Sequence, residues 1–294
     1  MKLTDEQKKE FRTQGFLIAR GALSDADLQP VIDELSGWID ARAQQLHAEG
    51  KIKDLHKHEP FAKRYGLLFG QCHDIGSGLD IMHYRGRAMF EFLHNENLLE
   101  LLESLIGPEL TCNPIQHLRA KPPLSQEGNA GPSFHNAPWH QDAGVMMEEA
   151  EGSDVVTCWL PVGRATQKMG CMEVIPGLVE TGYLRHLREG GTTIDPEVIP
   201  NMEPVVAECE KGDLVLMSRF TPHRSTPNYS DECRWSLDLR YQPTGQHTGR
   251  TGHPDFVARS RSNPASEMRD YDEWCRLWVD AFDNPKGHVG HRSP

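Results

Sequence analysis

The hydrophobic pattern of the chain changes near residue 110. Before that point, apolar residues recur every three or four positions in several segments, which is the period of an amphipathic helix. Thr4, Ser24 and Asn95 precede these segments, and side chains of these types cap helix N-termini. Pro30 lies inside the longest segment and predicts a kink or a restart there. Helices are therefore expected over 4–13, from 24 to a tail near 47–49, and over 95–106, with a buried strand at 16–19.

After residue 110 the chain consists of short apolar runs bounded by Gly, Pro and Asn, a pattern typical of β-strands. No helical segment separates consecutive runs, so a parallel sheet with crossover helices is not expected. The succession of short strands predicts a sandwich or a barrel. The expected strands cover 110–119, 139–145, 155–161, 171–176, 204–208, 213–218 and 234–241.

The C-terminal part differs from this core in pattern. An irregular stretch rich in Gly, Arg, Ser and Pro follows Gln242 and extends to about Pro264. A final helix is expected over 266–282, and its aromatic face should dock on the rest of the protein, because exposed tryptophans would be costly. We expect a single domain, with a mostly helical part at 1–109, a β core at 110–242 and an extension at 243–294.

The composition narrows the class of protein. Of the 294 residues, 37% are hydrophobic and 25% are charged, as in globular domains, and no apolar run approaches the length of a membrane-spanning helix. The formal net charge of −12 disfavours nucleic acids and anionic membrane surfaces as partners. Seven cysteines, none of them in a C-x-x-C pair, and an acidic N-terminus without an apolar core predict a cytoplasmic location.

Four pairs of a histidine and an acidic residue two positions apart are candidate metal ligands. The pair His140 and Asp142 lies in a predicted strand, where residues two apart project from the same face. A third ligand from another strand would complete the set of two histidines and one carboxylate that binds non-haem Fe(II). Chance also produces such pairs in a chain with 15 histidines. The other three lie in a helix tail, at a helix start and in an irregular stretch, at residues 47 and 49, 94 and 96, and 253 and 255.

His223 is the candidate third ligand, although a lone histidine at the end of a strand is more often structural. It follows a Gly-Asp turn and an apolar strand at 212–217. The next strand, 234–241, alternates polar and apolar residues. If its apolar face packs under helices, Arg234 faces a cavity, where a guanidinium fork suits a carboxylate; the alternative is an edge strand with a solvated polar face. The polar face consists of Arg234, Ser236, Asp238 and Arg240.

From residue 3 to residue 242, these motifs taken in order resemble the phytanoyl-CoA dioxygenase family of Fe(II)/2-oxoglutarate-dependent oxygenases. Each motif alone is weak, but their order and spacing together are specific. The region after Pro243 is not covered by the resemblance. The matching elements are T-Q-G-F-L-I at 13–18, K-P-P at 121–123, W-H-Q-D at 139–142, Trp159, G-C-M-E-V-I-P-G at 170–177, K-G-D at 211–213, His223 with Ser225, and Arg234.

The resemblance implies a fold and a metal site. The fold would be a double-stranded β-helix, a cupin-like jelly-roll barrel, in a mainly β protein with flanking helices (α+β). His140, Asp142 and His223 would be the iron ligands. Related halogenases have a small residue at the position of the carboxylate, so Asp142 favours oxygenation.

The resemblance also implies a cosubstrate site. Arg234, assisted by Ser225, would bind the distal carboxylate of 2-oxoglutarate. Trp159 and His117 match positions that line the cosubstrate pocket in relatives, with His117 a departure in residue type.

The implied reaction is hydroxylation, desaturation or cyclisation of a small organic molecule, coupled to conversion of 2-oxoglutarate and O₂ into succinate and CO₂. The loop 122–138, residues 60–85 and the segment after Pro243 are candidate walls of a substrate pocket. Asp238 and Arg240 would either touch substrate or pair with each other. Weaker candidates for substrate contact are His135, Phe134, Met146 and Met147.

Two other functions stay open from the sequence. One is a cupin-type metal dioxygenase that does not use 2-oxoglutarate, and the other is a metal-free barrel that binds a small molecule. The sequence leaves the substrate, the oligomeric state and the role of residues 243–294 undetermined.

Overall fold

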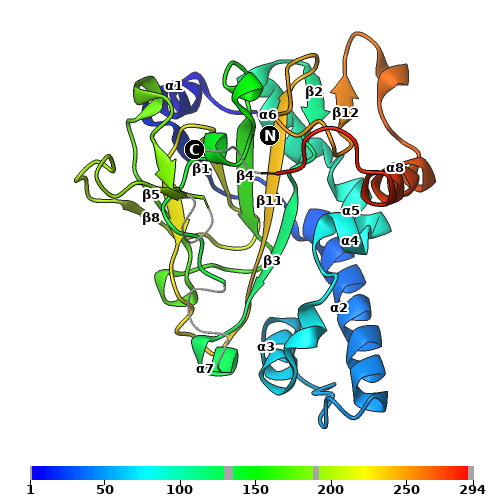
Figure 1. The fold of residues 1–294 in the computed structure, drawn as a ribbon. Helices are drawn as coiled ribbons and strands as arrows, with labels where there is room; N and C mark the ends of the chain where they lie inside the picture. Colours follow the sequence, from blue (N-terminus) through cyan, green and yellow to red (C-terminus); the bar gives the residue numbers. More distant parts are fainter. Residues whose placement is uncertain (1, 129–134, 188–191, 291–294) are drawn as a thin grey trace.

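The computed structural model describes residues 2–128, 135–187 and 192–290, and there the protein combines antiparallel sheets with helices (Figure 1). The predicted class is therefore confirmed at the level of mixed α and β structure with antiparallel sheets. Over the described residues, one sheet has seven strands and a second has three. A separate two-stranded pair joins β6 (His186–Leu187) to β7 (Thr193–Ile194).

The seven-stranded sheet is organised around one long strand, β11 (Arg234–Pro243). β11 pairs with β4 on one side, and on the other with β3 and then β2. Its apolar residues enter the main hydrophobic cluster, as the alternation of the sequence predicts. The other strands of this sheet are β1 (Phe16–Ala19), β2 (Glu109–Cys112), β3 (His117–Lys121), β4 (Val156–Pro161), β9 (Leu214–Ser218) and β12 (Phe256–Ser260).

The three-stranded sheet has the order β10-β5-β8. Its strands are β5 (Met172–Val174), β8 (Val205–Ala207) and β10 (His223–Ser225). An isolated bridge pairs His140 with His223 at the free edge of β10. This bridge carries the segment around residue 140 to the edge of the smaller sheet.

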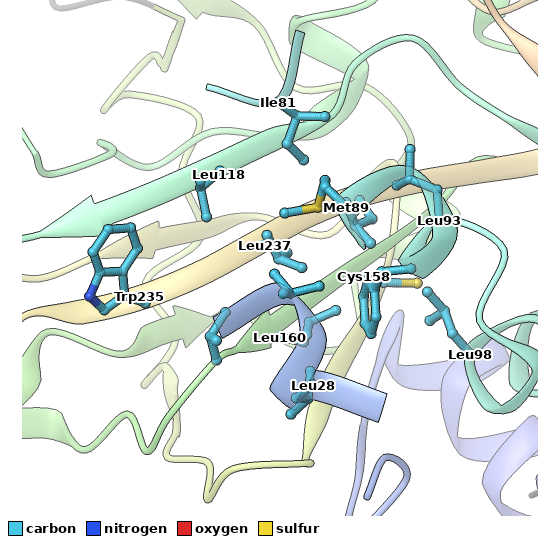
Figure 2. Close-up of a cluster of buried hydrophobic side chains, with 14 of the residues drawn as sticks. Leu28, Ile81, Met89, Leu93, Leu98, Leu118, Cys158, Leu160, Trp235 and Leu237 are labelled. Carbon is cyan, nitrogen blue, oxygen red and sulfur yellow. The ribbon is translucent and has the colours of Figure 1, made fainter. Parts of the chain in front are cut away.

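Helices α2, α5 and α6 cover the face of the large sheet that lies away from the small sheet (Figure 1). Figure 2 shows Leu28 of α2, Met89 of α5 and Leu98 of α6 in one cluster with sheet residues such as Leu237. In the described part of the chain, no helix is both long and apolar enough to cross a bilayer. The helices are α1 (Asp5–Gln14), α2 (Asp25–Ala48), α3 (Phe61–Gln71), α4 (Ile81–Tyr84), α5 (Arg87–Phe92), α6 (Glu96–Ile106), α7 (Leu124–Glu127) and α8 (Tyr271–Asp283).

Two strand predictions are wrong in detail. The expected strand 110–119 is two strands, β2 and β3, separated by the Asn113-Pro114 step, where proline cannot donate a ladder hydrogen bond. The expected strand 139–145 does not form. Only His140 makes a bridge, and a short 3₁₀ turn, Asp142–Gly144, follows it. The argument that residues 140 and 142 share one face of a strand therefore does not apply.

Several helical and terminal details also differ from expectation. α2 runs without interruption through Pro30, so the predicted restart is wrong. Residues 61–71, which carry little pattern, form α3, and the stretch after Gln242 contains β12. The last helix begins at Tyr271 rather than near 266.

The aromatic face of α8 docks as predicted. Trp274 and Trp278 are both buried, and Trp274 packs against Phe90 of α5 with ring centroids 5.2 Å apart. This contact joins the C-terminal extension to the helices that cover the large sheet.

Candidate metal centre and cavity

A cavity of about 750 Å³ is lined by residues of both sheets. The large sheet contributes the polar face of β11 together with residues of β3, β4 and β9. The small sheet contributes His223 and Ser225 of β10 and Met172 of β5. The prediction that the polar face of β11 looks into a cavity is confirmed, and its four polar residues all line it.

Two histidines that line this cavity come together with one buried carboxylate. His140, Asp142 and His223 each offer a ligand atom, and these atoms lie within 4.8 Å of one another. The bridge between residues 140 and 223 sets the two imidazoles side by side, with ring centroids 4.1 Å apart. The 3₁₀ turn that starts at Asp142, anchored by Ala143 N–H to the carbonyl of Arg219, turns the carboxylate toward them. The convergence predicted from sequence is present, but a turn produces it.

Each histidine is fixed in one tautomer by its own backbone. Nδ1 of His140 lies 2.8 Å from the carbonyl oxygen of Pro138, and Nδ1 of His223 lies 2.9 Å from that of Thr221. A carbonyl only accepts hydrogen bonds, so both Nδ1 atoms carry the proton. Nε2 of each ring is then left with a lone pair, the arrangement typical of metal-binding histidines.

The carboxylate of Asp142 is buried and held by two donors. Arg240 Nη2 donates to its Oδ1 at 2.5 Å, and the Thr157 hydroxyl donates to Oδ2. Burial opposes ionisation, but the charge and hydrogen bond of Arg240 together with the neighbouring His223 and His140 outweigh it and keep the Asp142 pKa below its usual range. Burial and the neighbouring His223 lower the pKa of His140 to about 3. The ionised carboxylate and neutral imidazole are the forms that bind a metal, so this donor set fits a divalent transition metal.

A buried guanidinium lies on the same cavity wall. Arg234 is 3% exposed, its Nη1 donates to Ser236 Oγ at 2.6 Å, and its Nε has no partner among the described residues. Its guanidinium lies over the ring of Trp159, 5.4 Å from the centroid. No carboxylate of the described residues forms an ion pair with Arg234. The residue therefore fits an anion supplied from outside the protein.

Ser225 and Lys121 lie beside Arg234 in this cavity. Lys121 Nζ donates to Ser225 Oγ at 3.0 Å and to Asn136 Oδ1 at 2.9 Å. Burial lowers the pKa of Lys121 to about 6, and Arg234 acts in the same direction. The sequence motif K-P-P marked this lysine, but its place in the cavity was not predicted.

Other predicted residues line the same cavity with partners of their own. His117 Nδ1 lies 2.7 Å from Asp80 Oδ2, so its imidazole is held toward α4. Asp238 pairs with Arg119 at 3.5 Å, whereas Arg240 pairs with Asp142. The predicted ion pair between Asp238 and Arg240 is therefore wrong, because each finds an opposite charge on another element.

The weaker candidates divide into three groups. His135 lines the cavity and lies 3.2 Å from Glu127, measured from Nδ1 to Oε1. Met146 is buried in a small apolar cluster with Ile115, and Met147 is not among the residues that line the cavity. Phe134 lies outside the described residues.

The three rival pairs do not assemble a metal site in the described part of the chain. There, three or more His, Cys, Asp or Glu donors come close enough to share a metal ion only at residues 140, 142 and 223. His94, for example, directs Nδ1 to the carbonyl of Phe90 and packs against Phe256.

Some residues of the site carried no sequence signal. Arg250 lines the cavity from the irregular stretch after β11, where nothing local indicates burial. Thr157 donates to Asp142, and Asp80 lies against His117. Both contacts join segments that are far apart in the sequence. Thr157 is the cross-strand partner of Arg240. A correct prediction of how β4 and β11 pair would have placed Thr157 beside Arg240.

Comparison with known proteins gives one family. The family model described as Phytanoyl-CoA dioxygenase (PhyH) matches residues 11–236. Among curated proteins, the chain is 23% identical over 243 residues to the 2-aminoethylphosphonate dioxygenase of Uncultured bacterium HF130_AEPn_1, covering 81% of each chain.

Solved structures show the same fold. The non-heme monooxygenase ThoJ in its nickel complex matches with a TM-score of 0.61 at 17% identity, over 95% of both chains. The epimerase SnoN, in complex with Fe3+, alpha ketoglutarate and nogalamycin RO, matches with a TM-score of 0.56 at 18% identity, over 84% of this chain and 87% of that one.

Proposed function

The chain belongs to the phytanoyl-CoA dioxygenase family and is an Fe(II)/2-oxoglutarate-dependent dioxygenase, and from this we propose that it oxidises a small organic molecule at an iron held by His140, Asp142 and His223. The observation that carries the proposal is that these three donors lie within 4.8 Å of one another, with His140 and His223 on the wall of a cavity that the buried Arg234 also lines. Two imidazoles and a carboxylate are a donor set that would hold Fe(II) and leave it able to bind further ligands.

The protein's part in metal binding follows from the contacts around the donors. The carbonyls of Pro138 and Thr221 orient the two imidazoles, and Arg240 holds the carboxylate ionised. When bound, the iron would supply the oxidative chemistry: 2-oxoglutarate and O₂ would yield succinate and CO₂, and the second oxygen atom of O₂ would enter the substrate or leave as water with two substrate hydrogens. The surrounding chain orients the ligands and excludes water.

Arg234 is proposed to bind the distal carboxylate of 2-oxoglutarate. Its guanidinium is buried, has an unused Nε donor and lies against Trp159. A bidentate pair with a carboxylate would satisfy these donors and offset the cost of burying the charge. Ser225, within reach of Lys121, would add a hydroxyl donor, and His117 would line the pocket further along β3.

We propose hydroxylation, desaturation or cyclisation as the reaction, since Asp142 occupies the position that a halide would need. We also propose that the two sheets form the double-stranded β-helix of this family and that residues 1–294 act as one domain. A cytoplasmic location remains a prediction from the sequence.

The decisive experiment is anaerobic titration of the protein with Fe(II) and 2-oxoglutarate, followed by visible absorption. A weak charge-transfer band is expected in the wild type, and Arg234→Ala should lose the band while still binding iron. Succinate release is then measured over a substrate panel that includes 2-aminoethylphosphonate, with His140→Ala as the inactive control.

The alternatives predict different outcomes. Iron binding without any band, in wild type and Arg234→Ala alike, would favour a metal dioxygenase that does not use 2-oxoglutarate. Failure to bind iron would favour a binding protein and would overturn the proposal.

A further inference from the structure

Arg250 is a second buried guanidinium in the cavity, and it lies outside the residues that the family model covers. It is 7% exposed. One side-chain nitrogen, Nη2, donates to the carbonyl of Val145 at 2.7 Å, and Nε is buried without a partner among the described residues. Over the same residues, no carboxylate lies within ion-pair distance of it. An arginine stays protonated at any physiological pH, so this charge is buried without compensation.

The other charges of the cavity are already assigned. Arg240 pairs with Asp142, and Arg119 pairs with Asp238. Asp80 faces His117. Arg234 is reserved for 2-oxoglutarate, so the inference rests on the proposed function at this point. Lys121 lies beside Arg234 and is held by Ser225 and Asn136. Arg250 is the arginine that remains without an anionic partner in the described part of the cavity.

Arg250 lies at the Arg240 end of the cavity. Burial lowers the pKa of Arg250 to about 10, and the nearby charge of Arg240 acts in the same direction. Arg234 and Arg240 are six residues apart on β11, or about 20 Å along an extended strand. The guanidiniums of Arg234 and Arg250 therefore belong to different ends of the cavity, and one small dicarboxylate at Arg234 leaves Arg250 unpaired.

The loop that carries Arg250 is fixed to the segment that follows the metal ligand Asp142. Met147 N–H donates to the Gly249 carbonyl at 3.1 Å, and Arg250 itself binds Val145, three residues after Asp142. A Cβ on Gly249 would lie 2.7 Å from that of Met146, so the backbones approach closely. This packing holds the guanidinium beside the candidate metal centre.

We propose that Arg250 binds an oxyanion of the substrate, so that the enzyme acts on small molecules that carry a carboxylate or a phosphonate. A guanidinium has five N–H donors, and only one is used by Val145. A planar fork is suited to two oxygens of one anionic group. A neutral side-chain donor could make the hydrogen bond to the Val145 carbonyl, so this bond does not explain why a charged residue is buried here. The protein's net charge of −12 contrasts with this cationic end of the cavity, and the local positive potential would concentrate anions there.

The proposal is tested by calorimetric binding to the full chain loaded anaerobically with Fe(II) and 2-oxoglutarate. The probes are matched ligands on n-propyl and cyclohexyl frameworks that differ only in the terminal carboxylate, phosphonate, alcohol or ammonium group. We expect the better anion to bind the wild type about 10- to 100-fold more tightly than the alcohol of the same framework. The carboxylate and phosphonate arms identify which oxyanion the site prefers.

Variants separate binding from structure. Arg250→Gln should lose the preference for anions while keeping the 2-oxoglutarate band, and Arg250→Lys should retain part of it because the charge remains. Arg261→Gln, an exposed arginine of the same extension, is the matched control and should bind anions like the wild type. If Arg250→Gln does not fold, the test compares the preference for anion over alcohol in the wild type with that in Arg250→Lys.

Equal binding of anion and alcohol to the wild type, no binding of any anion, or full anion preference in Arg250→Gln would overturn the inference. Absence of the 2-oxoglutarate band in the wild type would instead contradict the proposed function, and the same ligand series titrated into the metal-free chain would still decide the role of Arg250.

Discussion

Arg240 and Thr157 face each other across β11 and β4, and both donate hydrogen bonds to the carboxylate of Asp142. The pairing of two strands of the large sheet thus fixes a side chain that belongs to neither strand. Both donors and the carboxylate are buried. The proposed metal centre therefore depends on the register of the sheet, because a shift of one residue would turn Arg240 to the other face.

Replacing Arg240 should weaken metal binding. Arg240→Gln removes the charge that keeps Asp142 ionised and oriented, and loss of such a partner of a metal ligand typically lowers affinity about 10- to 100-fold. Calorimetric titration with Fe(II) under anaerobic conditions measures this. Arg119→Gln is the control, because Arg119 lies in the same cavity but pairs with Asp238. Unchanged affinity in Arg240→Gln would contradict the assigned role.

Binding of 2-oxoglutarate should take up a proton at Lys121. The pKa of this lysine is lowered to about 6 by burial, so it is mostly neutral at pH 7.5, and an anion bound beside it would favour the charged form. The affinity for 2-oxoglutarate should therefore fall as the pH rises above 6. Calorimetry in buffers of different ionisation enthalpy counts the proton.

The matched variants for this proton uptake are Lys121→Met and Lys168→Met. The first should abolish the uptake and flatten the pH dependence. The second replaces an exposed lysine and should retain both. Proton uptake that persists in Lys121→Met would assign it to another group.

The sequence predicted the ligand types and the wall of the cavity because both are local. The alternation along β11 is a period-two pattern that burial of one face imposes, and Arg234 follows from it directly. Spacing made His140 and Asp142 candidates, and the family resemblance gave them together with His223 as the ligand set. Their backbone was not predicted, because a single bridge and a 3₁₀ turn leave no periodicity.

Elements that depend on packing against distant segments could not be predicted from the sequence. α3 contains Gly66 and Gly70, which disfavour a helix, yet Phe61 stacks on Trp235 at 4.9 Å and Tyr65 contacts the same indole. Arg250 is similar, since its burial comes from the segment near Val145 and from nothing in its own neighbourhood. Tertiary contacts decide both.

Gly212 should tolerate no side chain. It has a φ of +93° in the turn before β9, and an added Cβ would lie 2.3 Å from the carbonyl oxygen of Leu23, whose N–H donates to Gly212. Gly245 has the same φ of +93° but open space around it. Gly245→Ala should thus cost only the backbone strain, about 1 kcal/mol.

Gly212→Ala should cost clearly more, because a backbone atom must move. Urea unfolding of the two variants gives the comparison. Equal losses of unfolding free energy would mean that the contact with Leu23 is absent in solution.

His94 should make the protein acid-sensitive through a site remote from the metal centre. The ring lies between Phe90 and Phe256, Nδ1 donates to the Phe90 carbonyl, and Nε2 has no partner among the described residues. Burial lowers the pKa of His94 to about 4, whereas an unfolded histidine titrates near 6.5. Between these values the unfolded chain binds a proton that the folded chain excludes.

The unfolding free energy should therefore fall by about 1.4 kcal/mol per pH unit from this residue as the pH drops from 6.5 to 4. His94→Phe keeps the aromatic packing and removes the titration. Loss of the hydrogen bond to Phe90 shifts the unfolding free energy equally at every pH. The slope of unfolding free energy against pH therefore reports only the proton bound at His94. Other titrating groups contribute equally to both proteins and cancel in the difference. Urea unfolding at several pH values between 4.5 and 7 measures both slopes. Parallel curves for wild type and His94→Phe would show that the folded protein admits the proton at His94.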